Sequence, residues 1–207
     1  MLSLDEIKSR IEQNVPGARA EIVPNPSVPA QSSLLLDSAH AFEVAGFLRD
    51  GAELRFDYAS NVTGVDWLDT TTKTKVKKLV DGVEKEVEES VTKLGYLEAV
   101  YHLYSMEFKH GPLVIRLRTA NRSDKVHIPS LTPIWRGAEF QEREVYDLYG
   151  IIFDGHPDLR RLLMWEGFQD HPMRKDYVEP DDYEYEPTPH DEVLEKAQAH
   201  RAKEAKA

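Results

Sequence analysis

The sequence predicts a protein that combines helices with a sheet, of the α+β or the α/β class. Residues 96–106 and 113–119 alternate apolar with polar side chains, as strands with one buried face do. Residues 4–14, 38–48 and 133–149 instead place their apolar side chains at helical spacing. Helices and strands therefore alternate along a chain of 207 residues, which is long enough for one domain with a core and an additional arm.

The chain is expected to begin with a helix and two short strands. The first helix, over residues 4–14, ends before Pro16-Gly17, because proline and glycine both disfavour a continued helix. Strands over 20–23 and 32–36 lie on either side of a proline-rich turn. The start of the chain lacks the apolar stretch of a signal peptide, so we expect a folded helix made in the cytoplasm.

A second helix is expected to begin at Ser38, whose hydroxyl can cap the first turn. Its apolar residues recur at a spacing of about one turn, which predicts one buried side. That side comprises Phe42, Ala45 and Leu48. A strand over residues 55–62 then leads to a corner at 63–67.

Residues 73–91 carry so many charges that a solvated or disordered loop is the alternative to a regular structure. Asp81-Gly82 lies between alternating residues and is a strong signal for a two-residue type I′ hairpin turn. Lysines and glutamates then face each other across the two strands, which stabilises the pairing. The predicted pairs are Val80 with Val83, Val76 with Val87, Lys77 with Glu86 and Lys75 with Glu88, whereas Lys78 faces Lys85. We therefore predict an exposed, charged hairpin.

The two alternating strands at 96–106 and 113–119 are joined by His110-Gly111-Pro112. Glycine followed by proline marks a turn, so these strands should pair antiparallel. Residues 121–128 are polar and are expected to connect the second strand to the next helix.

The helix predicted over 133–149 has two unlike sides. Thr132 can cap it, Pro133 suits its first position, and Gly150 can end it. The apolar side consists of Ile134, Ala138, Val145, Leu148 and Ile152. The other side carries Glu139, Arg143 and Asp147 at a favourable spacing of four, flanked by Glu142, Glu144 and Tyr146. This side holds more charge than solubility requires.

Residues 153–177 are unusual for a loop. The pairs His156-Pro157 and His171-Pro172 prevent one long helix, so the segment should be mostly extended. The basic clusters Arg160-Arg161 and Arg174-Lys175 alternate with apolar residues and suit contacts to partner carboxylates, although a solvated surface is the alternative. A partner chain is expected to cover the apolar residues, which are Leu159, Leu162, Leu163, Met164 and Trp165.

Composition excludes several functions. A net charge of −11 makes nucleic acid and anionic lipid poor partners. The absence of cysteine excludes disulfides, thiol catalysis and thiolate ligation of iron–sulfur clusters by this chain. No stretch approaches the roughly 18 apolar residues that a membrane-spanning helix needs. Residues 150–155 lack the Lys-Ser/Thr of a phosphate loop, so nicotinamide or flavin binding to this chain is not expected.

The carboxylates and histidines of this region raise the question of a metal or acid–base site. Their spacing argues against it, because Glu142 and Glu144 cannot face the same way on a helix and the two His-Pro pairs are far apart. Interface ion pairs with arginine and lysine are the favoured interpretation. The residues concerned are Glu142, Glu144, Asp147, His156, Asp158 and His171.

Three sequence blocks resemble those of a known family. The first runs from Glu142-Arg143-Glu144 to Gly150 and continues with Gly155-His156-Pro157-Asp158-Leu159-Arg160-Arg161. The second is His171-Pro172-Met173-Arg174-Lys175-Asp176-Tyr177, with methionine for the family's usual leucine. The third, in the first half, is Thr63-Gly64-Val65-Asp66-Trp67. Together they resemble the family of the 30 kDa subunit, or C subunit, of NADH:quinone oxidoreductase, respiratory complex I.

The resemblance implies an α+β fold in residues 1–150, with a mostly antiparallel sheet packed with helices and with the charged hairpin as an insertion. Residues 151–207 would form a long extended C-terminal arm that wraps the 49 kDa-type (D-type) subunit and contacts the cluster-bearing (B-type) subunit. No catalytic, metal or cofactor site is implied on this chain, because FMN and the iron–sulfur clusters belong to partner subunits. The assembly passes electrons from NADH to quinone and pumps protons, and this chain would lie peripherally on the cytoplasmic side of the cell inner (plasma) membrane.

The residues expected at the partner interface come from the first two blocks. They are Glu142, Arg143, Glu144, Asp147, His156, Asp158, Arg160, Arg161, His171, Arg174, Lys175, Asp176 and Tyr177. One alternative is a homologous subunit of a related membrane-bound hydrogenase or of a quinone oxidoreductase with another electron donor. A more distant alternative is a stand-alone metal-dependent hydrolase built on the carboxylates and His156.

Overall fold

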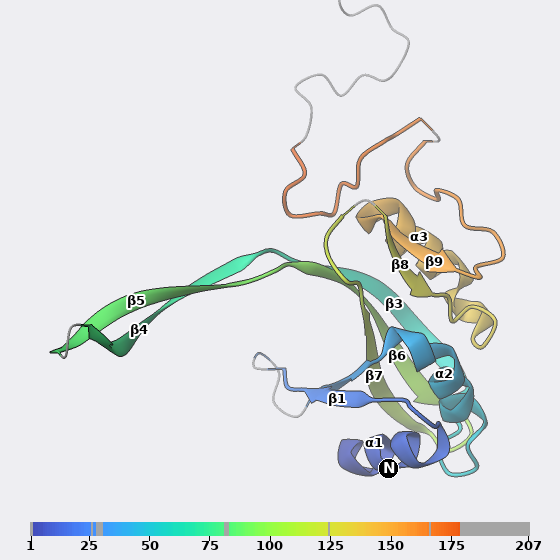
Figure 1. Ribbon diagram of the computed structural model, residues 1–207. Helices are drawn as coiled ribbons and strands as arrows, with labels where there is room; N and C mark the ends of the chain where they lie inside the picture. Colours follow the sequence, from blue (N-terminus) through green and yellow to red (C-terminus); the bar gives the residue numbers. More distant parts are fainter. Residues whose placement is uncertain are drawn as a thin grey trace, which may run out of the picture. The chain divides into compact units, whose positions relative to one another are not determined.

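The computed structural model describes most of the chain up to Val178. The described residues are 2–25, 27, 31–80, 83–123, 125–165 and 167–178, and the side chains of 73–89 are not among them. Residues up to Tyr177 form one unit of helices and strands (Figure 1). The predicted arm beyond Val178 lies outside the described residues.

A five-stranded sheet with the strand order β1-β2-β7-β6-β3 lies at the centre of this unit. Its strands are β1 (Ala20–Val23), β2 (Ser33–Leu36), β3 (Tyr58–Trp67), β6 (Tyr96–Ser105) and β7 (His110–Arg118). β6 and β7 pair antiparallel, as predicted, and within this sheet only β2 and β7 pair in parallel. A mostly antiparallel sheet packed with helices confirms the α+β class.

Two helices cover one face of the sheet. α1 (Leu4–Asn14) has the predicted bounds, and a capping box between Ser3 and Glu6 fixes its start. α2 (Ala41–Asp50) begins later than predicted, after the short 3-10 helix η1 (Ser38–His40). The predicted Ser38 cap is wrong, because the carboxylate of Asp37 accepts the hydrogen bond from the first turn.

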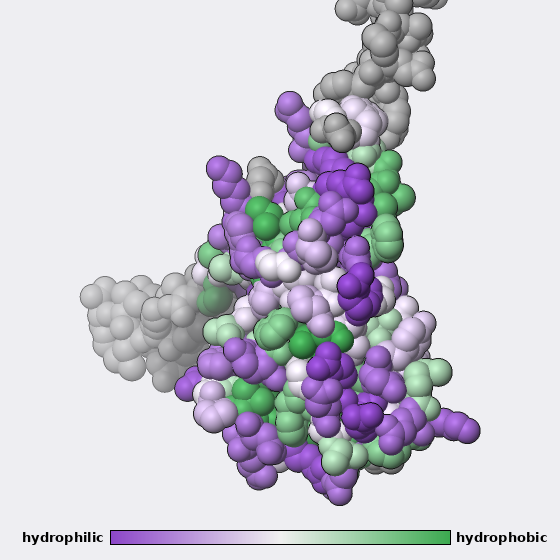
Figure 2. Space-filling view, turned by 90° about the vertical axis from the view of Figure 1, so that its right-hand side faces the viewer, coloured by the Kyte–Doolittle hydropathy of each residue, from purple (hydrophilic) through white to green (hydrophobic). Residues whose placement is uncertain are grey.

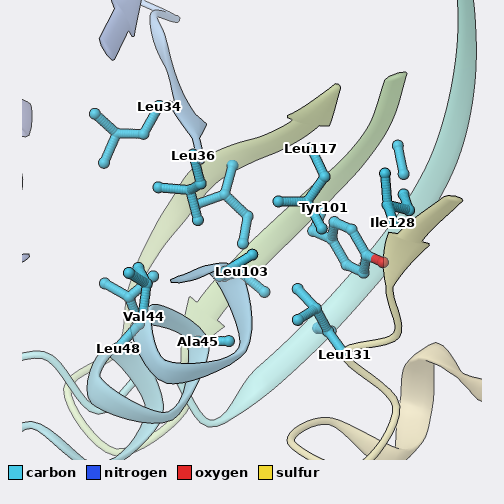
Figure 3. Packing of buried hydrophobic residues seen from close by; sticks show 14 of the residues in the cluster. Leu34, Leu36, Val44, Ala45, Leu48, Tyr101, Leu103, Leu117, Ile128 and Leu131 are labelled. Carbon is cyan, nitrogen blue, oxygen red and sulfur yellow. The ribbon is translucent and has the colours of Figure 1, made fainter. Parts of the chain in front are cut away.

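The buried side of α2 also differs from the prediction. Phe42 is 42% exposed, whereas Ala41, Val44, Ala45 and Leu48 are buried. These four residues recur at spacings of three and four and form one stripe, and Phe42 lies beside that stripe. Figure 3 shows Val44, Ala45 and Leu48 in the same cluster as Leu36, Leu103 and Leu117 from the sheet.

The predicted corner at residues 63–67 is wrong, because β3 runs through it. Thr63 to Trp67 pair with β6 from Val100 back to Tyr96. Gly64 and Asp66 disfavour strands by themselves, which is why the alternation appeared to end before them. In the fold both are on the buried face of β3, where they make the contacts described below.

The charged hairpin consists of β4 (Thr70–Val80) and β5 (Val83–Lys93). Its register is the predicted one, since the backbone pairs Val80 with Val83 and residues 75–78 with residues 85–88. The Asp81-Gly82 turn itself lies outside the described residues. The two strands run away from the five-stranded sheet (Figure 1).

The helix of the first sequence block is α3 (Glu139–Tyr149), which starts later than predicted, after the 3-10 helix η2 (Arg136–Ala138). Thr132 does not cap it, because its hydroxyl donates to the Glu142 carboxylate instead. Gly150 ends the helix as predicted, with a φ of 76° that glycine adopts most readily.

A second, two-stranded sheet extends the unit beyond α3. β8 (Val126–Pro129) and β9 (Ile151–Asp154) pair in parallel, so the predicted polar connection at 121–128 contains part of a strand. Ile151 and Phe153 are buried in the core. The unit therefore continues past the predicted boundary at residue 150 and includes the described residues of the arm up to Tyr177.

Candidate functional site

Asp147 of α3 fixes the chain segment that follows β9. Its side chain is fully buried, and one carboxylate oxygen accepts the backbone amides of Leu162, Leu163 and Met164 at 3.0, 2.7 and 2.9 Å. The other oxygen accepts the Arg161 guanidinium at 2.7 Å. Burial alone would raise the pKa of Asp147, but these hydrogen bonds outweigh it and lower the pKa. One carboxylate thus holds four consecutive residues against α3.

Arg143 holds the same segment from the preceding turn of α3. Its guanidinium donates to the carbonyl oxygens of Arg160 and Arg161, both at 3.2 Å, and lies 3.6 Å from the Asp158 carboxylate. The predicted row of ion pairs along the helix is therefore wrong for Arg143 and Asp147, since each reaches across to residues 158–164. Arg143 is 5% exposed.

Glu142 ties α3 to the central sheet. Its fully buried carboxylate accepts hydrogen bonds from four donors: the hydroxyls of Tyr101, Ser130 and Thr132 and the backbone amide of Leu131. Burial raises the pKa of Glu142 in spite of these donors. Glu144, between these buried residues, is exposed, which agrees with the sequence argument that Glu142 and Glu144 face different ways.

The two histidines of the His-Pro pairs bind backbone atoms. His156 places Nε2 2.9 Å from the Glu139 carbonyl oxygen, and its Nδ1 accepts the Asp158 amide at 3.0 Å. Both ring nitrogens are therefore used within the chain. His171 places Nδ1 3.1 Å from the Asp147 carbonyl oxygen at the end of α3. In the part of the chain that the structure describes, no three His, Asp or Glu side chains are grouped to hold a metal ion.

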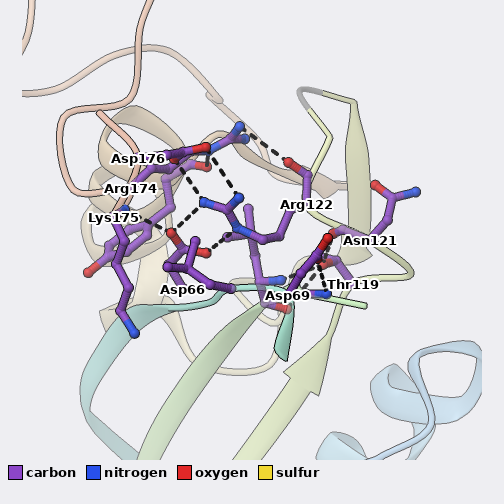
Figure 4. Close-up of polar contacts among 12 residues, drawn as sticks. Asp66, Asp69, Thr119, Asn121, Arg122, Arg174, Lys175 and Asp176 are labelled. Carbon is purple, nitrogen blue, oxygen red and sulfur yellow. Dashed lines mark hydrogen bonds and ion pairs between the residues drawn. The ribbon is translucent and has the colours of Figure 1, made fainter. Parts of the chain in front are cut away.

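The second and third sequence blocks meet at a buried ion pair (Figure 4). Arg122 donates to both oxygens of Asp66, at 2.6 and 2.7 Å, and also to the Asp176 carboxylate at 2.8 Å. Asp66 is 3% exposed and also accepts the Lys175 amide at 2.8 Å. These hydrogen bonds raise the pKa of Arg122, and they lower the pKa of Asp66 although burial acts in the opposite direction.

Arg174 completes this junction by donating to three backbone carbonyl oxygens. Its Nε lies 2.8 Å from the Tyr149 oxygen, and its Nη2 lies 3.1 Å from the Ser123 oxygen. A weaker contact of 3.4 Å reaches the Arg122 oxygen. The end of α3, the loop after β7 and residues 171–177 are thereby held together, and the three sequence blocks form one structural cluster.

Gly64 permits the close approach of α3 to β3. A Cβ at this position would overlap the ring of Tyr149. We expect Gly64→Ala to lower the free energy of unfolding by about 1–3 kcal/mol, because the ring has to move in a packed region. Urea unfolding measures this, with Gly137→Ala as the control, since its Cβ would meet only the Ala59 carbonyl at 3.5 Å. Tyr149→Ala removes the ring atoms that the new Cβ would overlap, so the double variant Gly64→Ala and Tyr149→Ala should lose less stability than the sum of the two single variants. Additive losses would contradict the proposed contact.

The outer surface of residues 160–175 is different in character. Here exposed apolar side chains are flanked by exposed charges, and we call these residues the outer strip: Arg160, Leu162, Leu163, Trp165, Met173 and Lys175. Leu163 is 61% and Met173 53% exposed. Figure 2 shows hydrophobic residues among hydrophilic ones on the face that carries α3.

The structure divides the predicted interface residues into three groups. Glu142, Arg143 and Asp147 are buried and bind other parts of this chain, and His156, Asp158, Arg161, His171, Arg174 and Tyr177 are partly buried. Glu144, Arg160, Lys175 and Asp176 are exposed. Their role at a partner interface stays a prediction. Sequence reasoning missed Arg122, because its partner Asp66 is distant in the sequence and no local pattern connects the two.

Comparison with known proteins places these blocks in a family. Residues 34–183 match the family model described as the respiratory-chain NADH dehydrogenase 30 kDa subunit. The C subunit of NADH-quinone oxidoreductase from Coxiella burnetii (strain RSA 493 / Nine Mile phase I) is 40% identical over 146 residues, or 67% of this chain and 63% of the relative. The C subunit from Salinispora arenicola (strain CNS-205) is 34% identical over 173 residues, or 84% of this chain and 60% of the relative.

Two solved structures are also similar. The trypsin-resistant fragment (1-134) of Nqo5 has a TM-score of 0.46 at 24% identity and covers 75% of this chain and 98% of the fragment. A chain of the membrane-bound sulfane sulfur reductase, an archaeal respiratory membrane complex, has a TM-score of 0.47 at 22% identity, with 84% and 85% coverage. The chain spans less than two thirds of the length of the two curated relatives above. Because the family model covers most of the central sheet, α3 and all three sequence blocks, the chain belongs to the family of the 30 kDa subunit of respiratory-chain NADH dehydrogenase.

Proposed function

We propose that this chain is a structural subunit, without a cofactor of its own, in the peripheral arm of a proton-pumping NADH:quinone oxidoreductase. It supports the transfer of electrons from NADH, through FMN and iron–sulfur clusters on partner subunits, to quinone. Family membership supports this assignment, as do the names of the relatives, which are C subunits of NADH-quinone oxidoreductase.

The observation that carries the proposal is how the side chains of the first two blocks are used. Asp147, Arg143 and Arg174 bind backbone groups of this chain, and the result is a fixed segment that presents the outer strip. Exposed tryptophan and methionine side chains with an arginine beside them are typical of surfaces that bind another protein. The use of both His156 nitrogens by backbone groups argues against the alternative of a metal-dependent hydrolase.

The proposed partners are the 49 kDa-type (D-type) subunit, which the arm would wrap, and the cluster-bearing (B-type) subunit. Among the described residues there is no helix with the length and apolar character needed to cross a membrane. We propose that the chain is attached peripherally, through its partners, to the cytoplasmic side of the inner (plasma) membrane.

Removing two apolar side chains from the outer strip should weaken assembly without unfolding the chain. In the double variant Leu163→Gln and Met173→Gln, both positions are largely exposed, so the thermal midpoint should not change. We expect at least a roughly tenfold loss of co-purifying subunits, because apolar anchors dominate such interfaces. The measurement is affinity purification of the tagged chain from gently solubilised membranes, followed by mass spectrometry.

Phe42→Gln on α2 serves as the matched control, because it also removes an exposed apolar side chain. Stoichiometric recovery of the partner subunits with the double variant would contradict the proposed interface. The complex purified with the unsubstituted chain is then assayed for NADH:quinone activity. The present proposal predicts that it oxidises NADH, whereas the alternative with another electron donor predicts an intact assembly that does not.

A further inference from the structure

The face of the central sheet opposite the helices carries an unusual set of side chains. Register places Glu98 of β6 opposite Arg118 of β7, and Val100 opposite Arg116. These residues point away from Leu97, Ala99 and Tyr101, which pack with α1 and α2 in the core. Glu98, Val100 and Val114 are nevertheless buried. This face, called the open face below, thus combines buried apolar and charged groups.

Two arginines on the open face share one buried carboxylate. The fully buried Glu98 accepts Arg118 at 2.9 and 3.0 Å and Arg116 at 3.1 Å, and it also accepts the Trp67 indole N–H at 2.9 Å. Two guanidinium groups therefore share this one carboxylate. Glu21 of β1 lies at the same groove but, among the described residues, makes no hydrogen bond or ion pair with either guanidinium, so one positive charge lacks a direct partner. The side chains of Arg116 and Arg118 are only 19% and 31% exposed, so water does not fully compensate for this charge.

Two buried nitrogen atoms on this face also lack hydrogen-bond partners among the described residues. They are Nε of Arg116 and Nδ1 of His102, which lies diagonally across from Arg116 on the neighbouring strand. Burial and the charge of Arg116 lower the pKa of His102. Buried polar atoms are nearly always hydrogen-bonded in complete structures, so the Nε–H of Arg116 has capacity for a further acceptor.

An apolar rim borders these charges. Trp67, Leu68 and Leu94, at the base of the β4–β5 hairpin, are 41%, 44% and 70% exposed. Together with Tyr96, Arg116 and Arg118 they line a groove of about 590 Å³. The Arg118 guanidinium lies 4.0 Å from the centre of the Tyr96 ring, a cation–π contact that restrains its position.

We propose that this groove binds a segment of a neighbouring subunit in which an aspartate or glutamate is flanked by apolar residues. The carboxylate would balance the charge of Arg116 and Arg118, and the apolar residues would cover Trp67, Leu68 and Leu94. A charged pair inside an apolar rim provides both affinity and specificity at protein interfaces. The inference rests on the proposed function, because the neighbouring chain is another subunit of that assembly.

A photoreactive residue at position 68 tests the groove directly. The full-length tagged chain with Leu68→benzoylphenylalanine is expressed in its own host and irradiated in intact cells, so the result does not depend on assembly surviving purification. We expect one dominant adduct, and mass spectrometry should map it to a segment of another subunit that contains an acidic residue beside apolar ones. Co-purification of unirradiated wild type tests the proposed function separately.

A second substitution at the exposed Leu94 tests the charge argument without disturbing the core. Leu94→Glu should lower the adduct yield about fivefold through repulsion of the bound carboxylate, whereas Leu94→Lys should preserve it. At position 68, the inference is overturned if no adduct forms, if the adduct joins the same chain or a second copy of it, or if the mapped segment has no acidic residue. It is also overturned if the two Leu94 variants give equal yields. Partner subunits that co-purify while position 68 gives no adduct would overturn this inference and leave the proposed function intact.

Discussion

Replacing Asp147 with asparagine is expected to lower the free energy of unfolding by about 3–5 kcal/mol. The buried carboxylate accepts three amides on one oxygen and Arg161 on the other. The asparagine side chain must point its NH2 group either at the three backbone amides or at Arg161. The donors on that side then lose their acceptor and stay buried without a hydrogen bond. Urea unfolding of the full chain at pH 7 measures the loss.

Glu144→Gln is the matched control for this substitution, because Glu144 is on the same helix but exposed, and it should change stability by less than about 0.5 kcal/mol.

The pH dependence of the stability difference between wild type and Asp147→Asn provides an independent test. Because the folded pKa of Asp147 lies below its ordinary value of 3.8, its contribution is complete above that pH and disappears as the pH falls through the folded pKa. The difference between wild type and variant should therefore shrink in acid, and a difference independent of pH would contradict the assigned role.

Asp66→Asn is expected to cost about 3 kcal/mol and to release residues 171–177 from β3. The carboxylate pairs with Arg122 through two short hydrogen bonds and holds the Lys175 amide, so its loss frees both. Limited proteolysis with trypsin reports the release, because Arg174 and Lys175 are cleavage sites within the freed segment. We expect cleavage there to become about tenfold faster, which corresponds to a decrease of about 1.4 kcal/mol in the free energy of local opening of this segment.

The neighbouring carboxylate supplies the control for Asp66. Asp176 also pairs with Arg122, but its side chain is 60% exposed, so Asp176→Asn should cost less than about 1 kcal/mol. Equal effects of the two substitutions would show that the burial of Asp66 does not matter, and the assigned role of the Asp66–Arg122 pair would then be wrong.

Local patterns predicted the parts of this fold that local interactions control. The bounds of α1 and the register of the β4–β5 hairpin follow from capping and turn residues, and both are as predicted. The starts of α2 and α3 were misplaced, because Ser38 and Thr132 use their hydroxyls in long-range hydrogen bonds, to Arg118 and Glu142, rather than as caps. A sequence pattern shows that a side chain can cap but not which distant group competes for it.

In the candidate site, too, distant contacts decide what local sequence patterns cannot predict. The charges of the sequence blocks suggested an outward surface for partner contacts, whereas Glu142 and Asp147 are fully buried and bind this chain. Charge at helical spacing does not distinguish solvent from a hydrogen-bonding cavity, because the donors that satisfy Asp147 come from residues 161–164 and are mainly backbone amides. The Asp66–Arg122 pair joins residues 56 positions apart and has no local signature.

The parallel pairing of β2 with β7 has a consequence for biosynthesis. Residues 34–36 pair with residues 115–117, so more than half of the chain must leave the ribosome before the central sheet can close. Pairings this distant in sequence raise the contact order and slow folding, and at about 5–20 residues per second the N-terminal strands wait several seconds for β7. The β4–β5 hairpin lies within this interval and can form by itself, because its strands are joined locally. Nascent chains that end before Arg118 should therefore expose the apolar residues of β2 and bind chaperones until β7 is synthesised.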